Sequence, residues 1–139
     1  MATKTGNLGR YALAGLLWGG LTILLAGRAF GDSIVGGVLA SPLIGLLVGS
    51  TMHRLFLSDS AWRRAWVSLA SLYLGAVLFG ASIGVYDWVR TGFDLGPEVV
   101  WQGAVAALYG TTLFLIGLWP LAYVTHMALA TDIRWWRRP

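Results

Sequence analysis

The sequence contains no cysteine and few charged residues. Among its 139 residues, Asp, Glu, Lys and Arg together make up 12%. The lack of cysteine excludes disulfide bonds, thiolate metal sites and a thiol nucleophile. Soluble domains carry about 25% charged residues. The low charge therefore argues against a soluble globular protein.

Charge is also missing from the middle of the long apolar stretches. Transporters that move protons usually hold an ionisable residue at that depth. Small four-span multidrug exporters depend on a carboxylate in their first span, and four-span fluoride channels are expected to show asparagines in their pore helices. This sequence has no such carboxylate and no asparagine after Asn7. Both of these classes are therefore disfavoured.

Apolar residues make up 57% of the chain and gather in four long runs. Each run is about as long as the roughly 20 helical residues that cross a hydrocarbon core. We expect transmembrane spans at residues 11–27, 33–52, 65–86 and 99–125. The predicted fold is an all-α membrane protein, a single transmembrane domain over residues 1–139, with four helices in an up-and-down bundle.

Small residues recur at intervals of four along these runs. This spacing lets two membrane helices approach closely, so we predict glycine-mediated helix packing. Pro42 should bend the second span, with the Ser41 hydroxyl bonding back to the carbonyl of Gly37. We call each such row of small residues a stripe. The helix that packs against each stripe, in the same chain or in another subunit, is left open. The predicted packing positions are Ser33, Gly37, Ser41, Gly45, Gly49, Gly15, Gly19, Ala76, Gly80 and Gly84.

The charges that remain are distributed asymmetrically between the two sides of the predicted bundle. Only Arg28 and Arg90 are basic on one side, which also holds most of the acids. Basic residues concentrate in cytoplasmic segments, so we expect both termini in the cytoplasm, at a bacterial inner membrane. Topology thus accounts for the net charge of +4, and we expect no nucleic-acid partner. The other side carries Lys4, Arg10, Arg54, Arg63, Arg64, Arg134, Arg137 and Arg138.

Tryptophans mark the expected ends of the spans. Amphipathic rings prefer the level of the lipid headgroups. Trp18 and Trp119 lie deeper and require either helix packing or a ligand to explain them. The predicted interface anchors are Trp62, Trp66, Trp88, Trp101, Trp135 and Trp136.

The two histidines, His53 and His126, lie at the cytoplasmic ends of the second and fourth spans. Their similar depth suits the two axial ligands of a b-type haem. The simpler interpretation is a pair of interfacial histidines near helix C-termini, where the helix dipole favours positive charge. We therefore expect no cofactor and no metal, and keep haem b as the alternative.

Three functions follow from these features. We favour a non-enzymatic membrane subunit that packs in the lipid bilayer with itself or with other membrane proteins. The first alternative is a channel or transporter for a small solute, with Gln102, Thr111 and Thr112 along its path. The second alternative is a haem-, pigment- or quinone-binding redox subunit. No nucleophile–base pair is visible, so no enzyme is expected.

Overall fold

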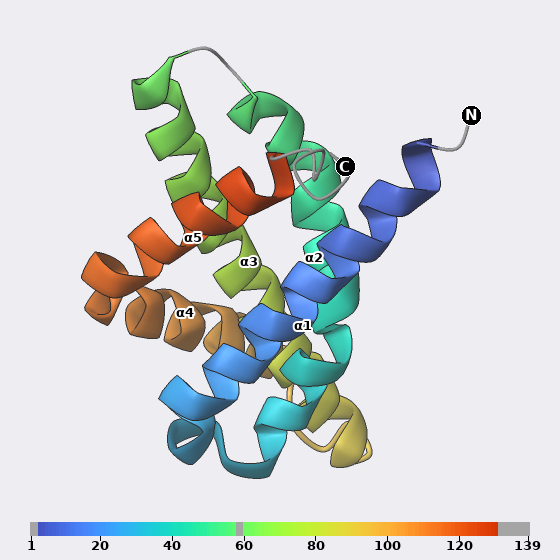
Figure 1. The fold of residues 1–139 in the computed structure, drawn as a ribbon. Helices are drawn as coiled ribbons and strands as arrows, with labels where there is room; N and C mark the ends of the chain where they lie inside the picture. The colour runs from blue at the N-terminus through green and yellow to red at the C-terminus, as the bar shows by residue number, and fades with distance from the viewer. Residues whose placement is uncertain (1–2, 58–59, 131–139) are drawn as a thin grey trace.

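The computed structural model describes residues 3–57 and 60–130, with side chains from residue 8 onward. The helices are the regular secondary structure of the described residues, which contain no strand, and this confirms the all-α prediction. Within these two ranges the chain forms a short 3-10 turn, η1, and five α-helices (Figure 1). The elements are α1 (Thr3–Phe30), η1 (Gly31–Ser33), α2 (Ile34–Phe56), α3 (Ala61–Arg90), α4 (Glu98–Leu113) and α5 (Leu115–Ala130).

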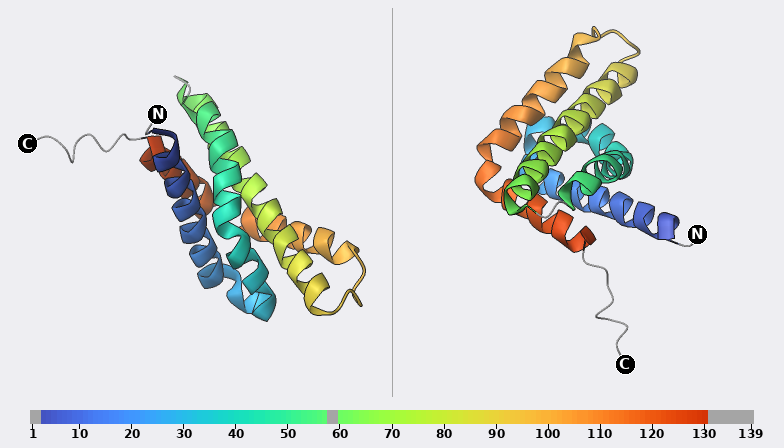
Figure 2. Two further views of the ribbon diagram at one scale, coloured as in Figure 1. Left: turned by 90° about the vertical axis from the view of Figure 1, so that its right-hand side faces the viewer. Right: turned by 90° about the horizontal axis from the view of Figure 1, so that it is seen from above.

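Helices α1 and α2 form an antiparallel hairpin. Gly31 has a φ of +54°, a left-handed conformation that glycine adopts without steric cost, and η1 reverses the chain there. The two helices lie side by side in both views of Figure 2. Both are longer than the predicted spans at residues 11–27 and 33–52.

Helix α3 is the centre of the structure, because it contacts α2, α4 and α5. It begins after Ser60, whose hydroxyl accepts a hydrogen bond from the backbone N–H of Arg63 at 3.4 Å. Such an N-cap supplies an acceptor to an N–H group that the first helical turn leaves unpaired. At its far end, Gly92 and Phe93 both adopt positive φ angles and turn the chain toward α4.

The predicted fourth span is broken, so the prediction of a single helix there is wrong. We expected one helix over residues 99–125, kinked by Gly117 and Pro120. The break instead lies at Phe114, where α4 and α5 meet at 94°. Pro120 lies inside α5, which continues through it. The physical reason is tertiary: α4 packs on the C-terminal half of α3, whereas α5 packs on the N-terminal half.

In the described part of the chain, two helical stretches are long and apolar enough to cross a membrane. They are Leu8–Phe56, which includes the α1–α2 hairpin, and Ala61–Arg90. The bent pair α4–α5 makes a third if it counts as one span. Large apolar side chains on these helices are widely exposed, for example Leu24 at 84% and Ile116 at 93%. The structure therefore has the character of a membrane protein.

Pro42 lies within α2, and the structure corrects the expected partner of Ser41. A proline has no N–H group, so the carbonyl four residues earlier, that of Val38, loses its helical donor. The Ser41 hydroxyl donates to this Val38 carbonyl at 2.7 Å, not to the carbonyl of Gly37. The serine thus supplies the hydrogen bond that the proline removes.

Candidate functional site

The small residues of the α1–α2 hairpin lie where the two backbones approach most closely. A Cβ atom added to Gly45 would lie 2.6 Å from the Cα of Gly15. One added to Gly19 would lie 2.6 Å from the Ser41 hydroxyl oxygen, and one added to Gly49 would lie 2.6 Å from the ring of Tyr11. These positions on α2 face α1 of the same chain.

The remaining positions of the stripe face other neighbours. A Cβ atom on Gly37 would lie 2.6 Å from the Phe79 ring of α3. Between α3 and α4, a Cβ atom on Gly80 would lie 2.7 Å from the Ala107 side chain, and one on Gly84 would lie 2.5 Å from Val100. The stripes are therefore filled largely within the chain, and their contribution to stability stays a prediction.

The structure brings His53 and His126 together. Their ring centroids lie 5.9 Å apart with the ring planes nearly parallel, at 9°. Both side chains are buried. The Nε2 atom of His126 is 2.8 Å from the hydroxyl oxygen of Ser71. Because the single Ser71 proton is donated to the Ser68 carbonyl, Ser71 accepts from His126, and Nε2 carries the proton of the neutral ring.

Phe56 completes this cluster, and sequence reasoning missed it. Its ring is only 1% exposed and lies 4.8 Å from the His126 ring and 6.4 Å from the His53 ring. These distances place Phe56 beside the midpoint of the two imidazoles. A porphyrin around an iron at that midpoint would overlap Phe56, so haem binding requires this ring to move. The signal was present: Phe56 follows His53 by three residues and so shares its helix face.

The two deep tryptophans make hydrogen bonds between helices. The indole N–H of Trp18 on α1 donates to the Thr125 hydroxyl on α5 at 3.2 Å. The indole N–H of Trp119 donates to the carbonyl of Ala65 at 2.9 Å and to Ser68 at 3.2 Å. Helix packing therefore explains the depth of both side chains.

The predicted interface tryptophans lie near the ends of the helices. Trp62 is 72% exposed and Trp66 is 51% exposed near the start of α3, and their rings meet edge to face. Trp101 is 68% exposed in the first turn of α4, and Trp88 packs against Phe93 near the end of α3. Two further anchors, Trp135 and Trp136, lie outside the described residues.

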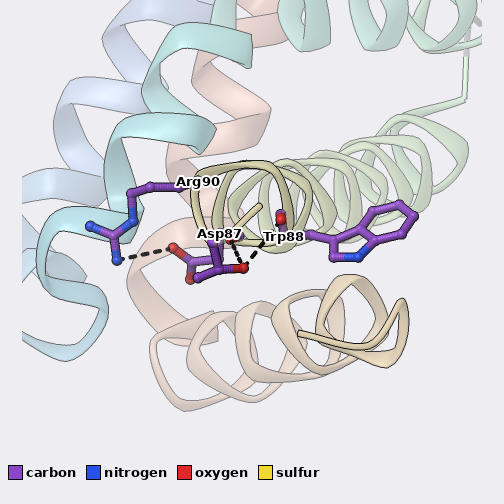
Figure 3. A network of polar contacts seen from close by, with 4 residues as sticks. Asp87, Trp88 and Arg90 are labelled. Carbon is purple, nitrogen blue, oxygen red and sulfur yellow. Dashed lines mark hydrogen bonds and ion pairs between the residues drawn. The ribbon is translucent and has the colours of Figure 1, made fainter. Parts of the chain in front are cut away.

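The C-terminal end of α3 carries an ion pair, drawn in Figure 3. A guanidinium nitrogen of Arg90 lies 3.6 Å from a carboxylate oxygen of Asp87. Asp87 thus offsets one of the two basic charges that we assigned to the outer side. Among the described residues, no three His, Asp or Glu side chains come close enough to hold a metal ion.

A cavity of about 200 Å³ lies between α1 and the α4–α5 pair, with α2 and α3 as its floor. We call it the central crevice. Its walls are almost entirely apolar, and much of the lining consists of glycine and alanine. A Cβ atom added to Gly75 or Gly110 would meet no atom within 4 Å, so the space beside both is open. Ala76, a predicted packing position, lines this crevice.

The three residues of the expected solute path lie in different places. Thr111 lines the central crevice. Thr112 is exposed and shares a 3.0 Å hydrogen bond with the Tyr73 hydroxyl. Gln102 lines a second pocket near the C-terminal end of α3, together with Asp87 and the predicted packing residue Ser33. The geometry therefore gives no continuous polar route through these three residues.

The described structure thus offers three features: the histidine cluster, the central crevice and the exposed α4–α5 break. A comparison of the chain with protein-family models, with curated proteins and with solved structures finds no match.

Proposed function

We propose that this protein is a multi-pass membrane subunit that binds another membrane protein through the corner between α4 and α5. The supporting observation is the exposed break at Phe114. Leu113 is 81% exposed, Phe114 49% and Ile116 93%, so little of this chain covers the corner. Figure 2, in the view from above, shows the two helices as arms that meet at the edge of the molecule.

Backbone chemistry explains why such a corner favours a partner. The Phe114 N–H donates to the Gly110 carbonyl, and the Gly117 and Leu118 N–H groups donate to the Phe114 carbonyl. Leu115 and Ile116 are the first residues of α5. Their N–H groups have no carbonyl in a preceding turn of the same helix to accept a hydrogen bond. Unpaired backbone groups in hydrocarbon cost several kcal/mol each, and irregular backbone at membrane depth is normally covered by protein. A partner helix at this corner supplies that cover.

The proposed subunit crosses the membrane four times, through α1, α2, α3 and the bent pair α4–α5. The start of α1, the end of α2, the start of α3 and the end of α5 lie at one end of the molecule (Figure 1). Basic residues Arg10, Arg54 and Arg63 fall at this end, which supports cytoplasmic termini and a bacterial inner membrane. The subunit works without catalytic chemistry of its own.

A single-cysteine cross-linker tests the proposed contact. Since the chain has no cysteine, Ile116→Cys gives one attachment point for a benzophenone at the corner. Leu24→Cys, on the exposed face of α1, is the matched control. On irradiation in native membranes, we expect a protein adduct from residue 116 and lipid adducts from residue 24. The adduct mass separates a second copy of this chain from another protein. Lipid adducts alone from both sites would overturn the proposal.

A further inference from the structure

We propose that the central crevice binds the headgroup of a membrane-soluble quinone, held by a hydrogen bond from Thr111. Phe114 borders both the crevice and the α4–α5 corner, but this inference is argued from the crevice lining alone and does not depend on the proposed subunit contact. It rests on the open volume, on the side chains that line it, and on the hydroxyl of Thr111, which lacks the hydrogen bond that other helical threonines make.

The size and the apolar walls of the crevice favour an apolar occupant. Apolar cavities of about 150 Å³ stay dry and accept molecules the size of benzene. The crevice, at about 200 Å³, exceeds this size, and its walls are apolar. Its two open glycines, Gly75 on α3 and Gly110 on α4, provide space that a larger side chain would fill. An apolar molecule from the bilayer is therefore favoured over water.

Thr111 indicates that the occupant also carries an oxygen. In four other helical threonines, the hydroxyl donates to the carbonyl four residues earlier. Thr111 is only 9% exposed and lines the crevice, yet its hydroxyl makes no hydrogen bond within the described residues. The Thr111 oxygen is open to the crevice, and leaving a hydroxyl unpaired in such apolar surroundings costs free energy. A ligand oxygen in the crevice would remove this cost. The four comparison residues are Thr22, Thr51, Thr112 and Thr125.

The position of Thr111 separates a quinone from an ordinary phospholipid. Thr111 lies three residues before the break at Phe114, near the middle of the segment between Glu98 and Ala130. A phospholipid keeps its oxygens at the headgroup level and offers only methylene groups at that depth. A quinone carries carbonyl oxygens on a ring that is soluble in the hydrocarbon. Aromatic side chains that pack against such a ring also line the crevice, namely Trp18, Phe79 and Phe114.

The test uses a benzoquinone with a decyl chain and, as the oxygen-free probe, decylbenzene. A ligand that binds only the folded state raises the unfolding temperature with concentration, which gives its Kd. For the purified protein in detergent, we expect the quinone to bind more tightly than decylbenzene. Thr111→Val should raise the quinone Kd roughly three- to tenfold, because one hydrogen bond is lost, and leave the decylbenzene Kd unchanged.

Matched variants keep this test specific. Thr112→Val changes the neighbouring threonine, whose hydroxyl is already bonded to Leu108 and Tyr73, and should leave both Kd values unchanged. Gly75→Leu should abolish binding of both probes because it fills the crevice. Gly20→Leu, at an equally open glycine outside the crevice, should not.

Two results would overturn the proposal. One is an absence of binding of either probe to the unmodified protein. The other is equal binding of quinone and decylbenzene with no effect of Thr111→Val, which would show a crevice for any apolar chain. If the valine variant does not fold, Thr111→Ser keeps the hydroxyl and should retain quinone binding, while Thr111→Ala should weaken it.

Discussion

Gly15 and Gly45 face each other across the α1–α2 hairpin so closely that neither position has room for a side chain. A Cβ atom on Gly45 would lie 2.6 Å from the Cα and 2.7 Å from the N of Gly15. The atoms in the way belong to the backbone, so a change of rotamer cannot relieve the clash.

We therefore predict that Gly45→Leu separates the hairpin and lowers stability by about 3 kcal/mol or more, the upper end of the usual cost of overpacking. The measurement is thermal unfolding of the purified protein in detergent. Gly20→Leu, which has no neighbour within 4 Å, is the control and should unfold like the unmodified chain. Equal unfolding temperatures for the two variants would show that the close approach does not hold the helices together.

Ser71 and His126 form a second pair whose loss should be costly. Ser71→Ala leaves the protonated Nε2 of the buried His126 ring without an acceptor, and we expect a destabilisation of about 1–3 kcal/mol. In a double-mutant cycle, the same change should cost less in a His126→Leu background, because no ring N–H remains unpaired. Ser50→Ala, an exposed serine bonded only to the Leu47 carbonyl, should have little effect. Additive effects of the two changes would contradict the pairing.

The cost of removing the Ser41 hydroxyl should likewise depend on a second residue, Pro42. In the unmodified chain, the Ser41 hydroxyl pairs the Val38 carbonyl that Pro42 leaves without a donor. Ser41→Ala should therefore destabilise α2 by about 1 kcal/mol. In a Pro42→Ala background the new backbone N–H pairs the same carbonyl, so the serine change should cost less. Chemical denaturation of the four proteins measures the difference, and an unchanged cost in both backgrounds would contradict it.

Trp18 and Thr125 connect α1 to α5 across the central crevice. These two helices share few other contacts. We predict that Trp18→Phe, which removes the donor, widens the distance distribution between them. Spin labels at Leu17→Cys and Val124→Cys, both exposed positions, report that distance by pulsed electron resonance. Trp62→Phe, at an exposed ring, is the control. An unchanged distribution in Trp18→Phe would show that other contacts hold α1 and α5 together.

The proposed orientation predicts which side of the membrane each connection faces. A membrane-impermeant maleimide added to intact cells should label Asp94→Cys, in the connection before α4, and should not label Arg63→Cys, at the start of α3. After lysis both should react, because both positions are exposed. The opposite pattern would reverse the orientation, and labelling of both in intact cells would contradict a single topology.

The sequence predicted the helical class and helices over the ranges where α1, α2 and α3 lie, because long apolar runs have few other stable solutions in a membrane. It also placed the interface tryptophans near helix ends, where Trp62, Trp66 and Trp101 lie exposed. It predicted one helix over residues 99–125, where the structure has the two helices α4 and α5. The break falls at Phe114 because α4 and α5 each follow a different part of α3, and such long-range contacts leave no local pattern.

The candidate site was also predictable from the sequence only in part. The similar depth of His53 and His126 followed from their positions in the sequence, but the Phe56 ring beside them did not enter that reasoning. The deep position of Trp18 was visible, whereas its partner Thr125, 107 residues away, was not. Thr111 was recognised only as a deep polar residue. That its hydroxyl lacks the local hydrogen bond of its neighbours is a property of the folded chain.

What the sequence by itself determined is the apolar, helical character of the chain and the small residues that allow its backbones to approach. These properties depend on composition and on periodicity, which act within a few turns of one helix. Only the tertiary structure decided that α2 fills its stripe with α1 and α3, that α4 and α5 meet at 94°, and that a crevice opens between α1 and the bent pair. Those outcomes depend on how helices distant in sequence share the surface of α3, and packing of that kind is settled only when all of them are in place.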